Sequence, residues 1–145
     1  MDQPERKLNL ALASLRVILG VVFVVHGAQK LLGWFGGGGI SGTAEFFGTL
    51  GLIPTMPLAV ISGAGELVGG LMVLFGLWMP IAAVVLTIDM VVAIIFRTIK
   101  LGFISGGGVE LNLLILAIIL ALVLLGPGRY SLADPLMRRR QGSSE

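Results

Sequence analysis

One apolar stretch of the sequence carries three side chains that can donate hydrogen bonds or carry protons. In VVFVVHGAQKLLGWFGGGG, residues 21 to 39, His26, Gln29 and Lys30 interrupt a run of aliphatic residues. His26 and Lys30 are four residues apart, so they would share one face of a helix, with Gln29 beside them. Because histidine titrates near neutral pH, this face fits a polar pocket for a head group or a proton carrier. The alternatives are a hydrogen-bonded interior histidine and a lysine that snorkels outward.

Two carboxyl groups lie at matching depth in later apolar stretches. Glu66 follows Pro57 by nine residues, and Asp89 follows Pro80 by nine, so both lie near the middle of an expected membrane helix. Ionisable groups near the bilayer centre cost at least about 2.5–3.5 kcal/mol each on insertion scales, so they usually find partners inside a bundle. If the two carboxyls face each other, like-charge coupling keeps at least one protonated, and together with His26 they would form a proton site. The alternative is two separate polar contacts that hold helices together.

Three more polar residues lie toward the same end of the expected bundle. Arg97 ends the third apolar stretch, and Glu110 and Asn112 begin the fourth after three glycines. Arg97 would cap a pocket, pair with Glu110 or anchor at lipid head groups. A carboxylate in the first turn of a helix is also favoured by the helix dipole alone. With the five residues above, these three predict one polar cavity in the outer half of the bundle.

Several kinds of chemistry are excluded by residue type. The chain has no cysteine and one histidine, which excludes thiolate metal sites, disulfides and bis-histidine haem ligation within the chain. The glycine runs follow no strand, so they are not phosphate-binding loops. We therefore expect no metal site and assign no catalytic residue. Nucleic-acid binding has little support because the positive charges lie mostly in the tails.

The elements that must position these residues are membrane helices. The chain has 145 residues, of which 56% are hydrophobic and 12% charged, whereas soluble domains carry about 25% charged residues. We predict an all-α integral membrane four-helix bundle with spans at about 10–32, 57–78, 80–97 and 109–125, each near the length needed to cross a bilayer. The second and third spans should form a tight antiparallel hairpin. TAEFFGTLGL in the first outer loop predicts a short interfacial or re-entrant helix, with Phe46 and Phe47 at the membrane interface.

The charge distribution predicts the orientation of the bundle. Residues 1–9 form an N-terminal tail, residues 10–128 the four-helix domain, and residues 129–145 a basic C-terminal tail. The first apolar segment runs past the usual length of a signal peptide, so we expect it to remain as a span. Positive charges near the termini outnumber those at the other end, which predicts that both termini are cytoplasmic. The terminal group comprises Arg6, Lys7, Arg16, Arg129, Arg138, Arg139 and Arg140, against Lys30, Arg97 and Lys100.

Three segments resemble the DoxX family of membrane proteins. These are HGAQKLLGWFGG at 26 to 37, GELVGGLMVLFGLW at 65 to 78, and SGGGVELNLLILAIILALVLLGPGRYSLAD at 105 to 134. The resemblance covers roughly residues 12 to 135. It implies a small four-helix protein of the bacterial cytoplasmic (inner) membrane. Relatives include subunits linked to thiosulfate:quinone oxidoreductase and terminal quinol oxidase systems, and others are thought to work with redox or stress-response proteins. The residues that match the family pattern are His26, Gly27, Lys30, Gly33, Glu66, Gly70, Glu110 and the GPGRYSLAD ending.

Three functions are consistent with the sequence. The first is a redox-associated subunit that binds a quinone or similar amphiphile in an outward-facing polar cavity. If this subunit is redox-active, a partner protein must supply the electrons, because the chain has no electron carrier of its own. The second is a non-enzymatic membrane scaffold or assembly partner, and the third a small lipid-handling or carrier protein. The expected partners are membrane lipids, a redox protein and other copies of the chain.

Overall fold

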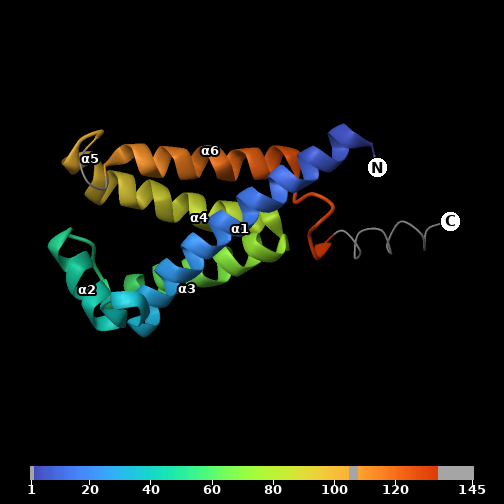
Figure 1. Cartoon of the computed structure of the whole chain (residues 1–145). Helices are drawn as coiled ribbons and strands as arrows, with labels where there is room; N and C mark the ends of the chain where they lie inside the picture. The colour runs from blue at the N-terminus through green and yellow to red at the C-terminus, as the bar shows by residue number, and fades with distance from the viewer. Residues whose placement is uncertain (1, 105–107, 134–145) are drawn as a thin grey trace.

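The computed structural model describes residues 2–104 and 108–133, and these residues form helices and connecting turns without a strand (Figure 1). The predicted all-α fold is confirmed. The elements are α1 (Gln3–Leu32), the 3₁₀ turn η1 (Trp34–Gly36), α2 (Gly39–Thr49), α3 (Thr55–Phe75), α4 (Met79–Ala93), the π-helical turn η2 (Ile94–Thr98), α5 (Ile99–Leu101) and α6 (Val109–Leu125).

The long helices have the length and composition of membrane spans. Within the described residues, three helices are long and apolar enough to cross a bilayer: α1, α3, and the continuous helix Met79–Leu101 that joins α4, η2 and α5. The apolar helix α6 has 17 residues, which is the lower end of the range for a span. The short helix α2 lies between the first and second of these helices in the chain, where the sequence predicts one.

Local sequence explains where the helices begin and end. The Asp2 side chain caps α1 by accepting a hydrogen bond from the backbone N–H of Glu5 at 2.9 Å, so the helix begins well before the apolar segment. Lys30 lies in its last turn, where a cation is favoured by the helix dipole. The hairpin between α3 and α4 turns at Gly76, whose φ of +68° suits glycine.

Glycines allow α1 and α3 to touch backbone to backbone. A Cβ atom added at Gly27 would lie 2.5 Å from the backbone nitrogen of Leu67, and one at Gly20 would lie 2.7 Å from the Cβ of Leu74. Both distances are shorter than real carbon contacts, so only glycine permits this approach. On another face of α3, a Cβ at Gly69 would lie 2.9 Å from the Leu86 side chain of α4. Gly65 lies four residues before Gly69, and a Cβ there would lie 3.1 Å from Val85 of α4, so this GxxxG pair faces α4 while other glycines of α3 face α1.

A buried arginine closes the end of the bundle that holds the chain termini. Arg16 is 2% exposed. Its Nη2 donates to the Tyr130 carbonyl at 2.9 Å, and its Nη1 donates to the Leu74 carbonyl at 3.4 Å. The N–H of Leu132 donates to the Phe75 carbonyl at 2.9 Å. These bonds fasten the segment after α6 to α1 and α3.

The N-terminus of α1 and the end of α6 lie at one end of the molecule, opposite α2 and α5 (Figure 1). Here the backbone N–H of Arg129 donates to the Asn9 side chain at 2.7 Å, and the Arg129 guanidinium lies 3.9 Å from Glu5. Most of the predicted C-terminal tail lies outside the described residues, including Arg138, Arg139 and Arg140. That this end faces the cytoplasm stays a prediction.

Candidate functional site

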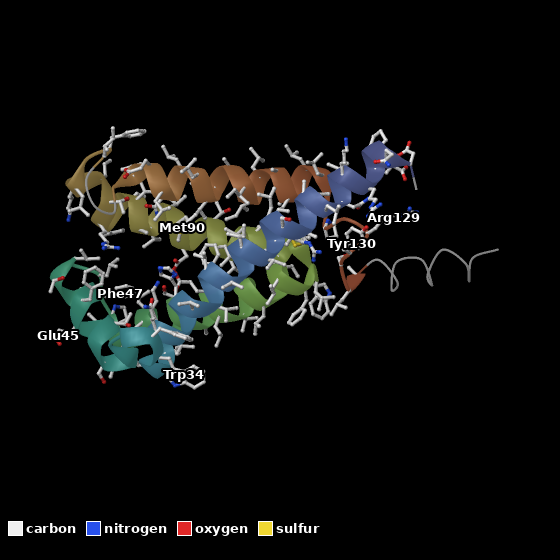
Figure 2. The ribbon with its side chains drawn as sticks, viewed as in Figure 1. Trp34, Glu45, Phe47, Met90, Arg129 and Tyr130 are labelled. Atoms are coloured by element: carbon white, nitrogen blue, oxygen red, sulfur yellow. The ribbon has the colours of Figure 1, made fainter. Side chains whose placement is uncertain are left out.

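A cavity of about 1340 Å³ lies between the long helices, on the side of the molecule that carries α2. Figure 2 shows Phe47 and Met90, which both line it, away from Arg129 and Tyr130 at the end with the chain termini. The wall is mostly apolar and combines residues of α1, α2, α3, α4, η2 and α6. Seven of the eight predicted site residues line it: His26, Gln29, Lys30, Glu66, Asp89, Arg97 and Asn112.

Lys30 is the centre of a charge network that joins three helices. Its Nζ lies 3.0 Å from Glu66 Oε1 and 3.8 Å from Asp89 Oδ2. It donates a hydrogen bond to Ser62 Oγ at 2.8 Å, and Ser62 Oγ donates to Asp89 Oδ1 at 2.6 Å. Side-chain exposure is 23% for Lys30, 4% for Glu66 and 16% for Asp89. Lys30 therefore points inward to two carboxylates and does not snorkel away from the bundle.

The local sequence of α3 explains why the network forms. Ser62 and Glu66 are four residues apart, so they share the helix face that meets α1 and α4. Gly63 lies beside them, and a Cβ there would be 3.1 Å from the Cβ of Lys30. The absence of a side chain at Gly63 thus lets the end of α1 come close enough for Lys30 to reach both carboxylates.

One ring nitrogen of His26 is held by the backbone of its own helix. Its Nδ1 lies 2.8 Å from the carbonyl oxygen of Val22. Because a carbonyl can only accept, Nδ1 carries the proton, and Nε2 carries the lone pair in the neutral ring. The ring lines the cavity and is exposed. His26 can therefore accept a hydrogen bond in its neutral form and donate one when protonated.

Gln29 and Asn112 are held by neighbouring groups. Gln29 Nε2 donates to the Phe35 carbonyl at 3.1 Å, in the turn where Phe35 has a positive φ of 54°. Asn112 is 8% exposed, and its Nδ2 lies 3.4 Å from Met90 Sδ, which links α6 to α4. Both residues line the cavity, and their hydrogen bonds also connect the elements that surround it.

Two aromatic residues of α2 lie under cations from other helices. Lys30 Nζ is 5.8 Å from the ring centre of Phe47, and Arg97 Cζ is 5.6 Å from that of Phe46. Both distances are within the range of cation–π attraction. Arg97 belongs to η2, so these contacts connect α2 with α1 and with the end of α4. The sequence predicted both phenylalanines at the membrane interface and did not predict that they line the cavity.

Glu110 is the predicted site residue that is not part of the cavity lining. It lies in the first turn of α6 and is half-buried beside Gly108. Successive residues of a helix are about 100° apart, so Glu110 and Asn112 point to nearly opposite sides. The structure therefore brings Asn112 to the cavity, whereas Arg97, one expected partner of Glu110, lies over Phe46.

Comparison with known proteins gives one family and three relatives. The family model DoxX matches residues 11–98, which include six of the eight predicted site residues. The chain is 37% identical to the "Putative oxidoreductase CatD" of Bacillus subtilis over 92% of this chain and 91% of that protein. It is 32% identical to the uncharacterized membrane protein Rv3486 of Mycobacterium tuberculosis, over 86% and 80% of the two chains. It is also 27% identical to an uncharacterized protein of Haemophilus influenzae, over 96% and 100%. No solved structure matches at a significant level.

Proposed function

This chain belongs to the DoxX family of membrane proteins, and we propose that it is a redox-associated protein that binds a quinone, or an amphiphile of similar shape, in the cavity beside Lys30. The name of the Bacillus subtilis relative, "Putative oxidoreductase CatD", supports the redox association. The observation that carries the proposal is a large, mostly apolar cavity whose lining includes a cation, two carboxylates and a histidine.

The cavity matches the chemistry of a quinone. A quinone is a flat apolar ring with two carbonyl oxygens that accept hydrogen bonds. Ligand sites are usually apolar clefts with a few polar groups that fix orientation. Lys30 Nζ and a protonated His26 can donate to a carbonyl oxygen, while aliphatic residues such as Val85, Ile88 and Ile115 line the cavity around the ring. Because the cavity is apolar except for one polar part, it favours an apolar ring with polar edges over an ionic metabolite.

The same residues can handle the protons of quinone chemistry. Reduction of a quinone to a quinol takes up two electrons and two protons. We assign the electrons to a redox partner protein, and the protons to His26 and the carboxyls of Glu66 and Asp89. Ser62 joins Lys30 to Asp89 through hydrogen bonds of 2.8 Å and 2.6 Å. Protons would therefore have a short path between the two carboxyls and the ligand.

The proposal is tested by measuring which quinones co-purify with the protein. The wild type, His26→Ala and Glu66→Ala are extracted in native lipid discs, and bound quinone is quantified by mass spectrometry. Glu45→Ala is the matched control, because Glu45 is an exposed carboxylate on α2 outside the cavity lining. Hydrogen bonds to charged groups contribute about 1.5–3 kcal/mol, so we expect about a tenfold or greater loss of quinone in both site variants. Equal quinone occupancy in all four proteins would refute the proposal.

One observation favours a second function, that of a scaffold for other membrane proteins. The Lys30 network is an internal connection between α1, α3 and α4, as expected of contacts that only hold helices together. In that case a partner protein would still be captured by the Glu66→Gln variant at wild-type yield. No quinone would be detected on either protein.

A further inference from the structure

The ring of long helices is closed on three sides near the cavity. Glycine contacts join α1 to α3 and α3 to α4, and the bond from Asn112 to Met90 links α4 to α6. The remaining seam lies between α1 and α6. These two helices contribute Leu12 and Leu122 to one buried core cluster, and then α1 runs away from α6 toward α2 (Figure 1).

Apolar and exposed side chains border this seam at the level of the cavity. Ile18 and Val22 of α1 and Leu111 and Leu114 of α6 all line the cavity. They are also exposed, Ile18 by 63% and Leu114 by 62%. These residues lie in helices of membrane-spanning composition, so the seam faces the acyl chains of lipids. An opening with such a border admits a hydrocarbon chain more readily than it admits an ion.

One face of α1 changes from apolar to polar along the cavity. Ile18, Val22, His26 and Lys30 follow one another at intervals of four residues, and all four line the cavity. At about 1.5 Å per residue, this stripe is about 18 Å long. Its polar end lies in the last turn of α1, and its apolar end lies nearer the middle of the helix. An amphiphile in the adjacent leaflet has the same arrangement, with its head at the membrane surface and its tail toward the midplane.

The α6 residues that line the cavity are aliphatic except for Asn112. Leu111, Leu114, Ile115 and Ile118 line the cavity with the spacing of a single helix face. The cavity volume of about 1340 Å³ also exceeds the range of about 300–1,000 Å³ that is usual for small-ligand sites. The space is thus larger than one quinone ring requires, and its surplus lies beside aliphatic residues.

We propose that the cavity takes a long-tailed amphiphile directly from the bilayer, through the seam between α1 and α6. The head lies at His26 and Lys30, and the tail follows Val22 and Ile18 past Leu114. This inference rests on the proposed function and names its substrate class, a prenylated quinone instead of a soluble ring. A tail gains little hydrophobic free energy on moving from lipid to an apolar wall. The seam therefore matters because it leaves room for the tail, and a side chain that fills it would exclude a tailed ligand by steric overlap.

The test blocks the seam from each side in turn. Val22→Trp and Leu114→Trp place a large ring in the opening. Val21→Trp and Leu113→Trp are matched controls, because these neighbours are also exposed and lie outside the cavity lining. Each protein is placed in lipid nanodiscs with a prenylated benzoquinone, or with the same ring bearing a methyl group in place of the prenyl tail. Bound quinone is measured by native mass spectrometry, and folding is checked by thermal unfolding.

We expect the two seam variants to lose the prenylated quinone by about tenfold or more, and to bind the tailless ring as the wild type does. The control variants should bind both probes normally. Equal loss of both probes would overturn the inference, since the tryptophan would then act on the head-group site. Unchanged binding of both probes in the seam variants would also overturn it, while the proposed function would stand if His26→Ala still abolished binding. If the wild type bound neither probe, the proposed function itself would fail.

Discussion

Replacing Lys30 by methionine tests whether the charge network holds α1, α3 and α4 together. Methionine keeps most of the apolar stem but removes the ammonium group, and with it the contacts of 3.0 Å and 3.8 Å to Glu66 and Asp89. Two acidic side chains, 4% and 16% exposed, then remain between the helices without their cation. The variant should therefore be less stable than the wild type.

The magnitude follows from the burial of the partners. Removing one member of a buried ion pair destabilises a protein by about 3–5 kcal/mol. Lys30 keeps 23% side-chain exposure, so solvent screening places the expected loss near the lower end, at about 3 kcal/mol. Neutralising both carboxyls in the same chain should recover more than half of this loss, because Glu66→Gln and Asp89→Asn remove the unpaired charges.

Reversible unfolding in mixed detergent micelles, followed by circular dichroism during a titration with sodium dodecyl sulfate, measures these free energies. Lys100→Met is the matched control, because Lys100 is exposed in α5 and lies outside the cavity lining. It should change stability by less than about 0.5 kcal/mol. The reasoning fails if Lys30→Met costs less than about 1 kcal/mol, or if the triple variant is less stable than the single one.

Four other predictions concern a glycine contact, the buried arginine, a cation–π contact and a surface ion pair. Gly27→Ala should destabilise the α1–α3 contact by about 1–3 kcal/mol or more. Gly42→Ala is the control and should not destabilise the protein, because an added Cβ there meets nothing within 4 Å. Equal unfolding curves for the two variants would contradict this. Arg16→Lys loses a planar donor that reaches two carbonyls and should cost about 1.5–3 kcal/mol; a thermal midpoint unchanged from wild type would disprove it. Phe47→Leu removes a cation–π contact of about 0.5–2 kcal/mol and should speed amide exchange in α2, with no such effect expected in α6. Arg129→Ala breaks an exposed pair of 3.9 Å and should change stability by less than about 0.5 kcal/mol; a larger loss would show that this pair is more than a surface contact.

The class of fold could be predicted because a bilayer imposes a simple requirement on sequence. Long apolar runs must form helices, since every backbone group in lipid needs an internal partner. Pro57 and Pro80 lie in the first turns of α3 and α4, as their missing N–H groups predict. The spacing of four residues predicted that His26 and Lys30 share one helix face, and both line the cavity.

What could not be predicted depends on how helices cross. Sequence spacing fixes which residues share a face of one helix, but it does not fix the rotation of that helix against its neighbours. The contacts of Lys30 with Glu66 and Asp89 therefore could not be predicted from the spacing of residues along any one helix. The position of Phe47 over the cavity depends on the path of the glycine-rich turn before α2. The π-helical turn around Arg97 contains no proline or glycine, so no local sequence signal predicts it.

The hydrogen bonds of Arg16 fix α1 to its neighbours at the end of the bundle that holds the chain termini. Because Arg16 fastens α1 to the end of α3 and to the segment after α6, a rotation of α1 against its neighbours would have Arg16 as its pivot. Lys30 lies about 21 Å farther along the same helix, so a rotation of about 5° at the pivot moves it by about 2 Å. That displacement is enough to separate Lys30 from Glu66, which now lie 3.0 Å apart. Any ligand that wedges α1 outward would therefore release a carboxylate at the moment it arrives.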